Sequence, residues 1–197
     1  MSRLNEDVLI LIFEELKNDK KSLYSCLLVN RTWCETTVSV LWKNPGQYSI
    51  TENAKSMLFD VIFLHLSEES RDILKNKGIN DHLTEIYQHP SFNYINFWKY
   101  LNLSLIKSII PLTNVEKNSD VSIISNEILK LFINGNTKFI HLTTPRYYFG
   151  RLHQIPGFER CFAELESFHC NVKTNKKILE GLTIICKSIK KLVIENN

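Results

Sequence analysis

The sequence predicts a mainly α-helical fold with some β structure: a three-helix module at the N-terminus, a helical linker region and a short α/β repeat segment at the C-terminus. Two observations support this prediction. Apolar residues recur at helical spacing through most of the chain. Toward the C-terminus they recur instead at positions i, i+3 and i+5 of three separate stretches, which suits short strands. The length of 197 residues is enough for one domain, or for a small module joined to a larger one.

Residues 1–45 predict three short helices with tight connections. The first covers residues 4–16, where Asn5 or Ser2 can cap the free backbone amides of the first turn. A polar break leads to the second helix, for which Ser22 is the expected N-cap. The third is expected to end before Pro45, which together with its neighbours Asn44 and Gly46 cannot continue a helix.

The first helix carries more apolar residues than one surface stripe requires, with an unbroken apolar run from Val8 to Phe13. Ile10 and Leu11 lie outside the main apolar face, so they need a second neighbour. That neighbour is either a protein partner or residues 54–66 of the same chain. A projection at 100° per residue assigns the main face to Val8, Leu9, Ile12, Phe13 and Leu16.

Residues 46–120 predict a helical linker region. Residues 52–66 and 67–78 are expected to form successive helices that join near Ser67. Residues 97–110 are apolar enough to belong to a core, either as a helix or as a strand.

Residues 121–197 predict a repeat array. From Ile140 to Phe168 and from Phe168 to Leu192 the spacings are 28 and 24 residues, inside the range of about 20–29 residues that is typical of leucine-rich repeats. We therefore expect a helix and a short strand per repeat, stacked into a curved solenoid. Residues 156–157, Pro-Gly, interrupt the helix expected in the middle repeat. The three stretches are Thr137-x-x-Ile140-x-Leu142, Leu165-x-x-Phe168-x-Cys170 and Ile189-x-x-Leu192-x-Ile194.

Two parts of the chain resemble known families. The N-terminal module is similar to the F-box family over about 40 residues, with Asn5 and Asn30 where that family usually has proline and cysteine. Residues 175–197 resemble the cysteine-containing leucine-rich repeats common behind F-boxes, with Cys186 before the strand and Asn134 in that place two repeats earlier. The F-box resemblance rests on Leu4-x-x-Asp7-Val8-Leu9-x-x-Ile12-Phe13-x-x-Leu16, on Leu23, on Val29-Asn30-Arg31-x-Trp33 and on Leu41-Trp42.

These resemblances imply a substrate-recognition subunit of a Skp–cullin–F-box ubiquitin ligase. The module would bind the Skp-type adaptor, and through it the cullin-RING ligase, while the repeats would hold a protein substrate. Other subunits transfer ubiquitin, so the chain is expected to be non-catalytic and to need no cofactor. The adaptor contact, or its direct support, is assigned to Leu4, Asn5, Val8, Leu9, Val29 and Trp33. Because side chains alternate along a strand, six residues are expected to point outward toward a substrate: Phe139, His141, Ser167, His169, Lys191 and Val193.

The sequence shows no catalytic or metal-binding constellation. His169 and Cys170 are adjacent on an expected strand and so point to opposite faces, which prevents them from acting as a base and a nucleophile. Cys170 is expected to be a small core residue. The histidines lack the HExxH spacing of a metal site.

A competing interpretation makes the second and third helices a helix-turn-helix that binds nucleic acid. Residues 1–48 hold six basic and six acidic residues, a net charge of zero. A DNA-binding module needs a basic face, because neutralising phosphates dominates its affinity. Docking of a protein is therefore preferred, and an F-box scaffold with no role in ubiquitin transfer is a further alternative.

The cysteines and the hydropathy predict a cytoplasmic or nuclear protein without a membrane partner. The five cysteines are odd in number and never spaced as CxxC, which fits reduced thiols. The longest apolar run is shorter than the roughly 18 residues that span a bilayer. The repeat array is expected to be abbreviated, with an open edge on its last strand that could pair with another chain.

Overall fold

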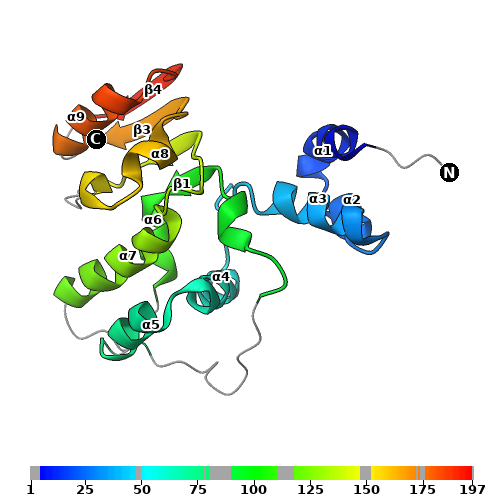
Figure 1. Cartoon of the computed structure of the whole chain (residues 1–197), viewed down its shortest axis with the longest axis horizontal. Coiled ribbons are helices and arrows are strands. Elements are labelled where there is room, and N and C mark those ends of the chain that lie inside the picture. The colour runs from blue at the N-terminus through cyan, green and yellow to red at the C-terminus, as the bar shows by residue number, and fades with distance from the viewer. Residues whose placement is uncertain are drawn as a thin grey trace.

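The computed structural model describes residues 5–47, 50–77, 79, 90–110, 118–146, 152–171, 173 and 176–196. It is mainly helical and contains one small parallel sheet of four strands, which confirms the predicted class of mainly α with some β. Figure 1 shows two parts, with helices α1–α3 projecting to one side and the other helices gathered around the sheet. In the part of the chain that is described, every helix is too short or too polar to cross a membrane.

The first part, the N-terminal module, contains α1 (Glu6–Glu15), η1 (Leu16–Asn18), α2 (Lys20–Cys26) and α3 (Arg31–Leu41). Side chains start each helix of the module, with Asn5 at α1 as predicted. Asn5 accepts a hydrogen bond from the Asp7 amide, and Asn30 accepts one from the Trp33 amide at 3.0 Å. The second helix begins earlier than expected, because Asp19 and not Ser22 is its N-cap; Asp19 accepts bonds from the Ser22 amide at 3.2 Å and the Ser22 hydroxyl at 2.6 Å.

The module has a small core of its own, because α1 and α2 both pack on α3. Phe13 meets Trp33 edge to face, with ring centroids 5.3 Å apart. The fully or nearly buried members of this core are Leu9, Phe13, Leu23, Cys26 and Val40.

The module joins the rest of the molecule at the end of α3. The Trp42 ring lies 4.5 Å from that of Tyr94, in η2 (Tyr94–Phe97). The Lys99 amide donates to the Lys43 carbonyl at 2.9 Å. Because residues 98–102 lead directly into the sheet, these contacts attach the module beside the first strand.

The next two helices, α4 (Glu52–His65) and α5 (Glu68–Lys75), meet at Ser67 as predicted, and Ser67 caps α5. Polar contacts tie α5 and the turn after it to α7 (Asn118–Phe132). Ser70 Oγ donates to the buried carboxylate of Glu127 at 2.9 Å, and Lys77 pairs with Asp120 at 3.0 Å. The buried charge of Glu127 is thus hydrogen-bonded, as burial of a carboxylate requires.

The sheet is built from β1 (Tyr100–Asn102), β2 (His141–Thr143), β3 (Ser167–Asn171) and β4 (Lys191–Glu195), in sequential order. The segments between them carry α6 (Leu103–Ile109) and α7, then η4 (Leu152–Gln154) and α8 (Phe158–Phe162), then α9 (Lys176–Ile185). Strand β1 lies inside the predicted helical linker region 46–120, within residues 97–110, for which the sequence allows either a helix or a strand. It ends where Asn102 caps α6, by accepting bonds from the amides of Ser104 and Leu105.

The strand register shows that the apolar spacing recurs four times and corrects the predicted alignment of the first stretch. Leu101, Leu142, Phe168 and Leu192 are paired across the sheet. The stretch at β2 is therefore Phe139-x-x-Leu142-x-Thr144, two residues later than predicted, and Trp98-x-x-Leu101-x-Leu103 precedes it at β1. Phe139, expected to face a substrate, is fully buried (0% exposed) because it occupies the first core position, as Leu165 does at β3. Ile140, expected inward, is half-buried.

Thiol hydrogen bonds connect consecutive units. Cys186 Sγ donates to the carbonyl of Phe162, the last residue of α8, at 3.2 Å. Burial raises the pKa of the Cys186 thiol to about 11, so the thiol keeps its proton at neutral pH. In the corrected register the position of Cys186 corresponds to Asn136 rather than Asn134. The Asn134 side chain bonds locally instead, to the Leu131 carbonyl and the Asn136 amide.

The Pro-Gly interruption at residues 156–157 has the predicted effect of breaking the helix into η4 and the short α8. Gly157 has φ of 94°, and a Cβ at this position would lie 2.7 Å from the Gly135 nitrogen. A side chain would thus be excluded both by conformation and by space.

The register supplies a matched pair of substitutions for testing the core. Leu142→Ala should lower the free energy of unfolding by about 2–5 kcal/mol, because Leu142 is fully buried. Leu192 lies in the same row but is largely exposed, so Leu192→Ala should lower the free energy of unfolding by less than about 1 kcal/mol. Urea denaturation followed by circular dichroism in dilute samples measures both. Equal losses would contradict the assigned burial.

Candidate functional site

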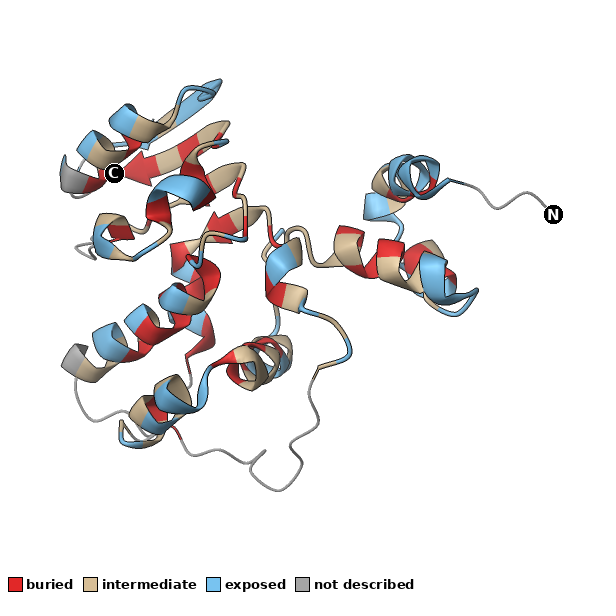
Figure 2. Cartoon of the chain, in the orientation of Figure 1, coloured by how far each residue is buried: buried red, intermediate tan, exposed pale blue. Residues whose placement is uncertain are grey.

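The N-terminal module exposes large apolar side chains although it also has a complete core. Leu28 is 87% exposed and Leu11 is 68% exposed. Figure 2 shows α1 largely in the colour of exposed residues. In α1, residues 8, 11 and 12 are one turn or less apart on one face, so their side chains adjoin. We call the following set the module's apolar surface: Val8, Ile10, Leu11, Ile12, Tyr24, Leu28 and Val29.

Some of the residues predicted to contact an adaptor are exposed, and others are buried and support the helices from inside. Val8 and Val29 belong to the apolar surface, and Asn5 is exposed at the start of α1. Leu9 is buried, and Trp33 is half-buried against Phe13, so these two hold the helices in place from within. Leu4 lies outside the described residues.

The sequence interpretation missed Leu28, the most exposed member of this surface. Leu28 stands in the apolar triplet 27–29 directly before Asn30, the N-cap of α3, and a triplet in a turn cannot face one core completely. Val8 and Ile12, expected on the buried face of α1, are about 40% exposed, because α1 contacts α3 through a narrower stripe.

The alternative in which the remaining apolar residues of α1 pack on residues 54–66 is wrong. Leu11 is largely exposed and Ile10 is partly exposed. Figure 1 places α4, which contains residues 54–65, on the far side of α3 from α1. The apolar surface is therefore open to a partner.

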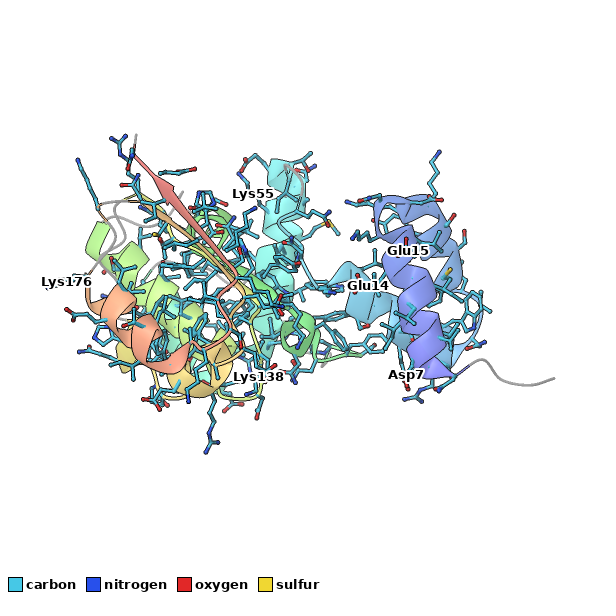
Figure 3. The ribbon with its side chains drawn as sticks, turned by 90° about the horizontal axis from the view of Figure 1, so that it is seen from above. Asp7, Glu14, Glu15, Lys55, Lys138 and Lys176 are labelled. Carbon is cyan, nitrogen blue, oxygen red and sulfur yellow. The ribbon has the colours of Figure 1, made fainter. Side chains whose placement is uncertain are left out.

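Two basic residues of the module, Arg31 and Lys43, are paired with acidic side chains. Arg31, at the start of α3, pairs with Glu35 at 2.7 Å. Lys43 pairs with Glu14, and Figure 3 shows Glu14 on the side of α1 that faces the rest of the molecule, with Asp7 near the N-terminal end of that helix. The basic residues named here are thus neutralised locally, which disfavours binding of nucleic acid by α2 and α3.

A second candidate surface is the face of the sheet turned away from the core, here called the outer face. It presents, in two rows set by the register, Tyr100, His141, Ser167 and Lys191, then Thr143, His169 and Val193. Five of the six residues predicted to face a substrate lie here, and Phe139 does not. Tyr100 was missed because residues 97–110 were left as either helix or strand and were not counted among the repeats. Its ring lies 5.5 Å from that of His141.

His141 is the most connected residue of the outer face. Its Nδ1 lies 2.9 Å from Ser167 Oγ, and its Nε2 lies 2.9 Å from Thr143 Oγ1. Burial, followed by the nearby charges of His169 and Lys191, lowers the pKa of His141 below its ordinary value of 6.5. A neutral ring can donate at one nitrogen and accept at the other, which matches two hydroxyl partners.

His169 lies beside a carboxylate on the same face. Its Nε2 lies 2.9 Å from Glu195 Oε1, although the direction of the contact does not make it a hydrogen bond. His169 and Cys170 do point to opposite faces, since Cys170 is buried.

A cleft of about 480 Å³ lies between the module and β1. Its walls include Lys17, Lys20, Tyr24, Trp42 and Tyr100. Over the described ranges, no three His, Cys, Asp or Glu side chains come together as metal ligands would, here or elsewhere.

Comparison with protein-family models, curated proteins and solved structures finds no match to this chain. The module's apolar surface and the outer face remain the features that bear on function. One can bury apolar area against a partner, and the other can exchange hydrogen bonds and charge with a ligand.

The lowered pKa of His141 predicts that the folded state becomes less stable as the pH falls. The unfolded chain binds a proton at this residue more readily than the folded chain. The contribution is therefore present above about pH 6.5 and is lost as the pH falls through the folded-state pKa. His141→Gln should show a smaller decline in the free energy of unfolding between about pH 7.5 and about pH 5. Urea denaturation at a series of pH values measures this, and an unchanged decline would contradict the assignment.

Proposed function

We propose that this chain is an F-box-type substrate-recognition subunit of a ubiquitin ligase. The N-terminal module docks a Skp-type adaptor through its apolar surface. The helix–strand units that follow form a short leucine-rich-repeat-like solenoid, whose outer face holds a protein substrate. The chain performs no covalent chemistry; it raises the effective concentration of the substrate beside the transferring subunits.

The observation that carries this proposal is the module's apolar surface. Complete burial of a leucine or valine side chain contributes about 1.5–3 kcal/mol, so leaving Leu11, Leu28 and Val29 exposed forgoes a large stabilisation. The module already has a core, formed around Leu9 and Phe13. An apolar surface outside a satisfied core, on a module of zero net charge, suits a protein partner rather than a nucleic acid.

The arrangement of the strands supports the repeat part of the proposal. The strands follow one another in sequential order and are all parallel. Each unit therefore pairs with its immediate neighbours, as repeats of a solenoid do. Buried residues at i, i+3 and i+5 recur at β1, β2 and β3, and β4 repeats the spacing with exposed apolar residues.

The outer face supports substrate recognition because its side chains can both donate and accept. Ser167 and Thr143 supply hydroxyl groups, and Lys191 supplies an exposed cation. Tyr100 adds an aromatic ring beside His141. A polypeptide carries backbone and side-chain groups of both kinds, so it can exchange hydrogen bonds with this face, and tyrosine is among the residues enriched at protein interfaces.

The adaptor contact can be tested on exposed residues that the fold does not need. The double variant Leu11→Ala, Leu28→Ala should lose at least ~2 kcal/mol of binding free energy to a purified Skp-type adaptor, a loss of affinity of more than tenfold. Isothermal titration calorimetry measures the affinity, and circular dichroism verifies the fold.

A matched control removes apolar side chains of similar exposure elsewhere. Met57→Ala in α4 and Ile184→Ala in α9 change residues that are 68% and 77% exposed, outside the module. Binding of the adaptor should be unaffected in the control. Absence of binding by the parent chain, or equal losses in both variants, would refute the docking site.

Substrate capture should be separable from adaptor binding. In a pulldown from cell lysate with identification of stoichiometric partners, Tyr100→Ala, His169→Ala should lose the substrate and keep the adaptor. The Leu11→Ala, Leu28→Ala variant should show the reverse. Loss of both partners in either folded variant would contradict the assignment of adaptor and substrate to separate surfaces.

A further inference from the structure

Strand β4 has a free edge and an uncovered apolar face. Within the described residues it pairs with β3 alone, and Figure 1 shows it as the outermost strand of the sheet. Its core-position residues Leu192 and Ile194 are 55% and 52% exposed, whereas Phe168 and Cys170, their neighbours in β3, are 2% and 3% exposed. The apolar side of β4 therefore continues the buried layer of the sheet beyond the point where the chain covers it.

The backbone of β4 identifies the groups at the free edge. The Lys191 amide donates to the Glu166 carbonyl at 3.0 Å, so Lys191 directs its amide toward β3. Successive residues of a strand direct their backbone groups to opposite edges. The N–H and C=O groups of Leu192 and Ile194 therefore point away from β3, where a further strand would meet them.

The β4 sequence Lys-Leu-Val-Ile-Glu is complementary to itself when two copies run antiparallel. With Val193 on a two-fold axis, Lys191 stands opposite Glu195 of the second copy. Leu192 then stands opposite Ile194 of the second copy. Charges of opposite sign and apolar side chains are thereby matched on their respective faces, and opposite-charge pairs stabilise such a ladder.

The hydrogen-bond pattern agrees with this alignment. In an antiparallel ladder, hydrogen-bonded residue pairs alternate with non-bonded ones. The outward groups of Leu192 bond those of Ile194 across the axis, twice by symmetry, and Val193 forms the non-bonded pair between them. Every edge group assigned above thus has a partner in the second copy.

We propose that two copies of this chain associate through antiparallel pairing of their β4 edges, joining two four-stranded sheets into one continuous sheet. The apolar side chains at positions 192 and 194 of each copy cover one another at the junction. Glu195 lies at the outer face beside His169, where Lys191 of the second copy reaches it. This inference does not depend on the proposed ubiquitin-ligase function.

The test is sedimentation velocity of the full chain over a range of concentrations. The parent chain should form a dimer. Lys191→Glu and Glu195→Lys should each raise the dimer dissociation constant about tenfold, because each places like charges opposite at two symmetric positions. An equimolar mixture of the two variants should recover association, since every facing pair is then of opposite sign. A monomeric parent chain, or variants that associate as it does, would overturn the proposal.

Two further variants separate this edge from other surfaces. Ile194→Pro removes an amide that points away from β3, so it should abolish the dimer while circular dichroism stays unchanged. Leu28→Ala, in the module's apolar surface, should leave the dimer intact. A dimer that survives Ile194→Pro, or is lost with Leu28→Ala, would overturn the assignment to β4.

Discussion

The parallel register that pairs Leu101, Leu142 and Phe168 across the sheet is the constraint on which most of the structure depends. These side chains are buried because each strand turns alternate residues toward the helices, where Trp98 packs against Phe132 with ring centroids 4.6 Å apart. A slip by one residue would expose the whole row and bury the polar one. The register thus determines both the core and the outer face.

That outer face follows from the same alternation. His141, Ser167 and Lys191 share a row because the residues that follow them, Leu142, Phe168 and Leu192, are paired in the next row, whose members in β2 and β3 are buried. Partial burial and nearby positive charge keep His141 neutral, which preserves its two hydroxyl contacts. A polar network of this kind is specific where it is satisfied, because breaking one contact leaves a half-buried group unpaired.

In the N-terminal module, by contrast, less of the apolar side-chain area is buried in a core. Its core is small, and the helices meet through few side chains, so much of the apolar surface of α1 stays outside. The contacts of Trp42 with Tyr94 and of Lys43 with Lys99 attach the module at the end of α3. Leu11 and Leu28 are largely exposed among the described residues, as the proposed docking function requires.

The sequence by itself determined the local structure. Asn5, Asn30 and Ser67 can accept bonds from free amides, so the starts of α1, α3 and α5 could be predicted from residue type alone. The Pro-Gly interruption and the inward position of Cys170 follow likewise from local chemistry and strand alternation.

Only the tertiary structure decided which apolar residues face inward. Phe139 and Ile140 are both apolar, and nothing local distinguishes their faces; the pairing of Leu142 with Phe168 makes that choice. Strand β1 could not be predicted because its three residues become a strand only through pairing with β2. The exposure of Leu28 and Leu192 has the same cause. Burial of a side chain depends on the neighbours that the fold brings to it, and the adjacent sequence does not determine these neighbours.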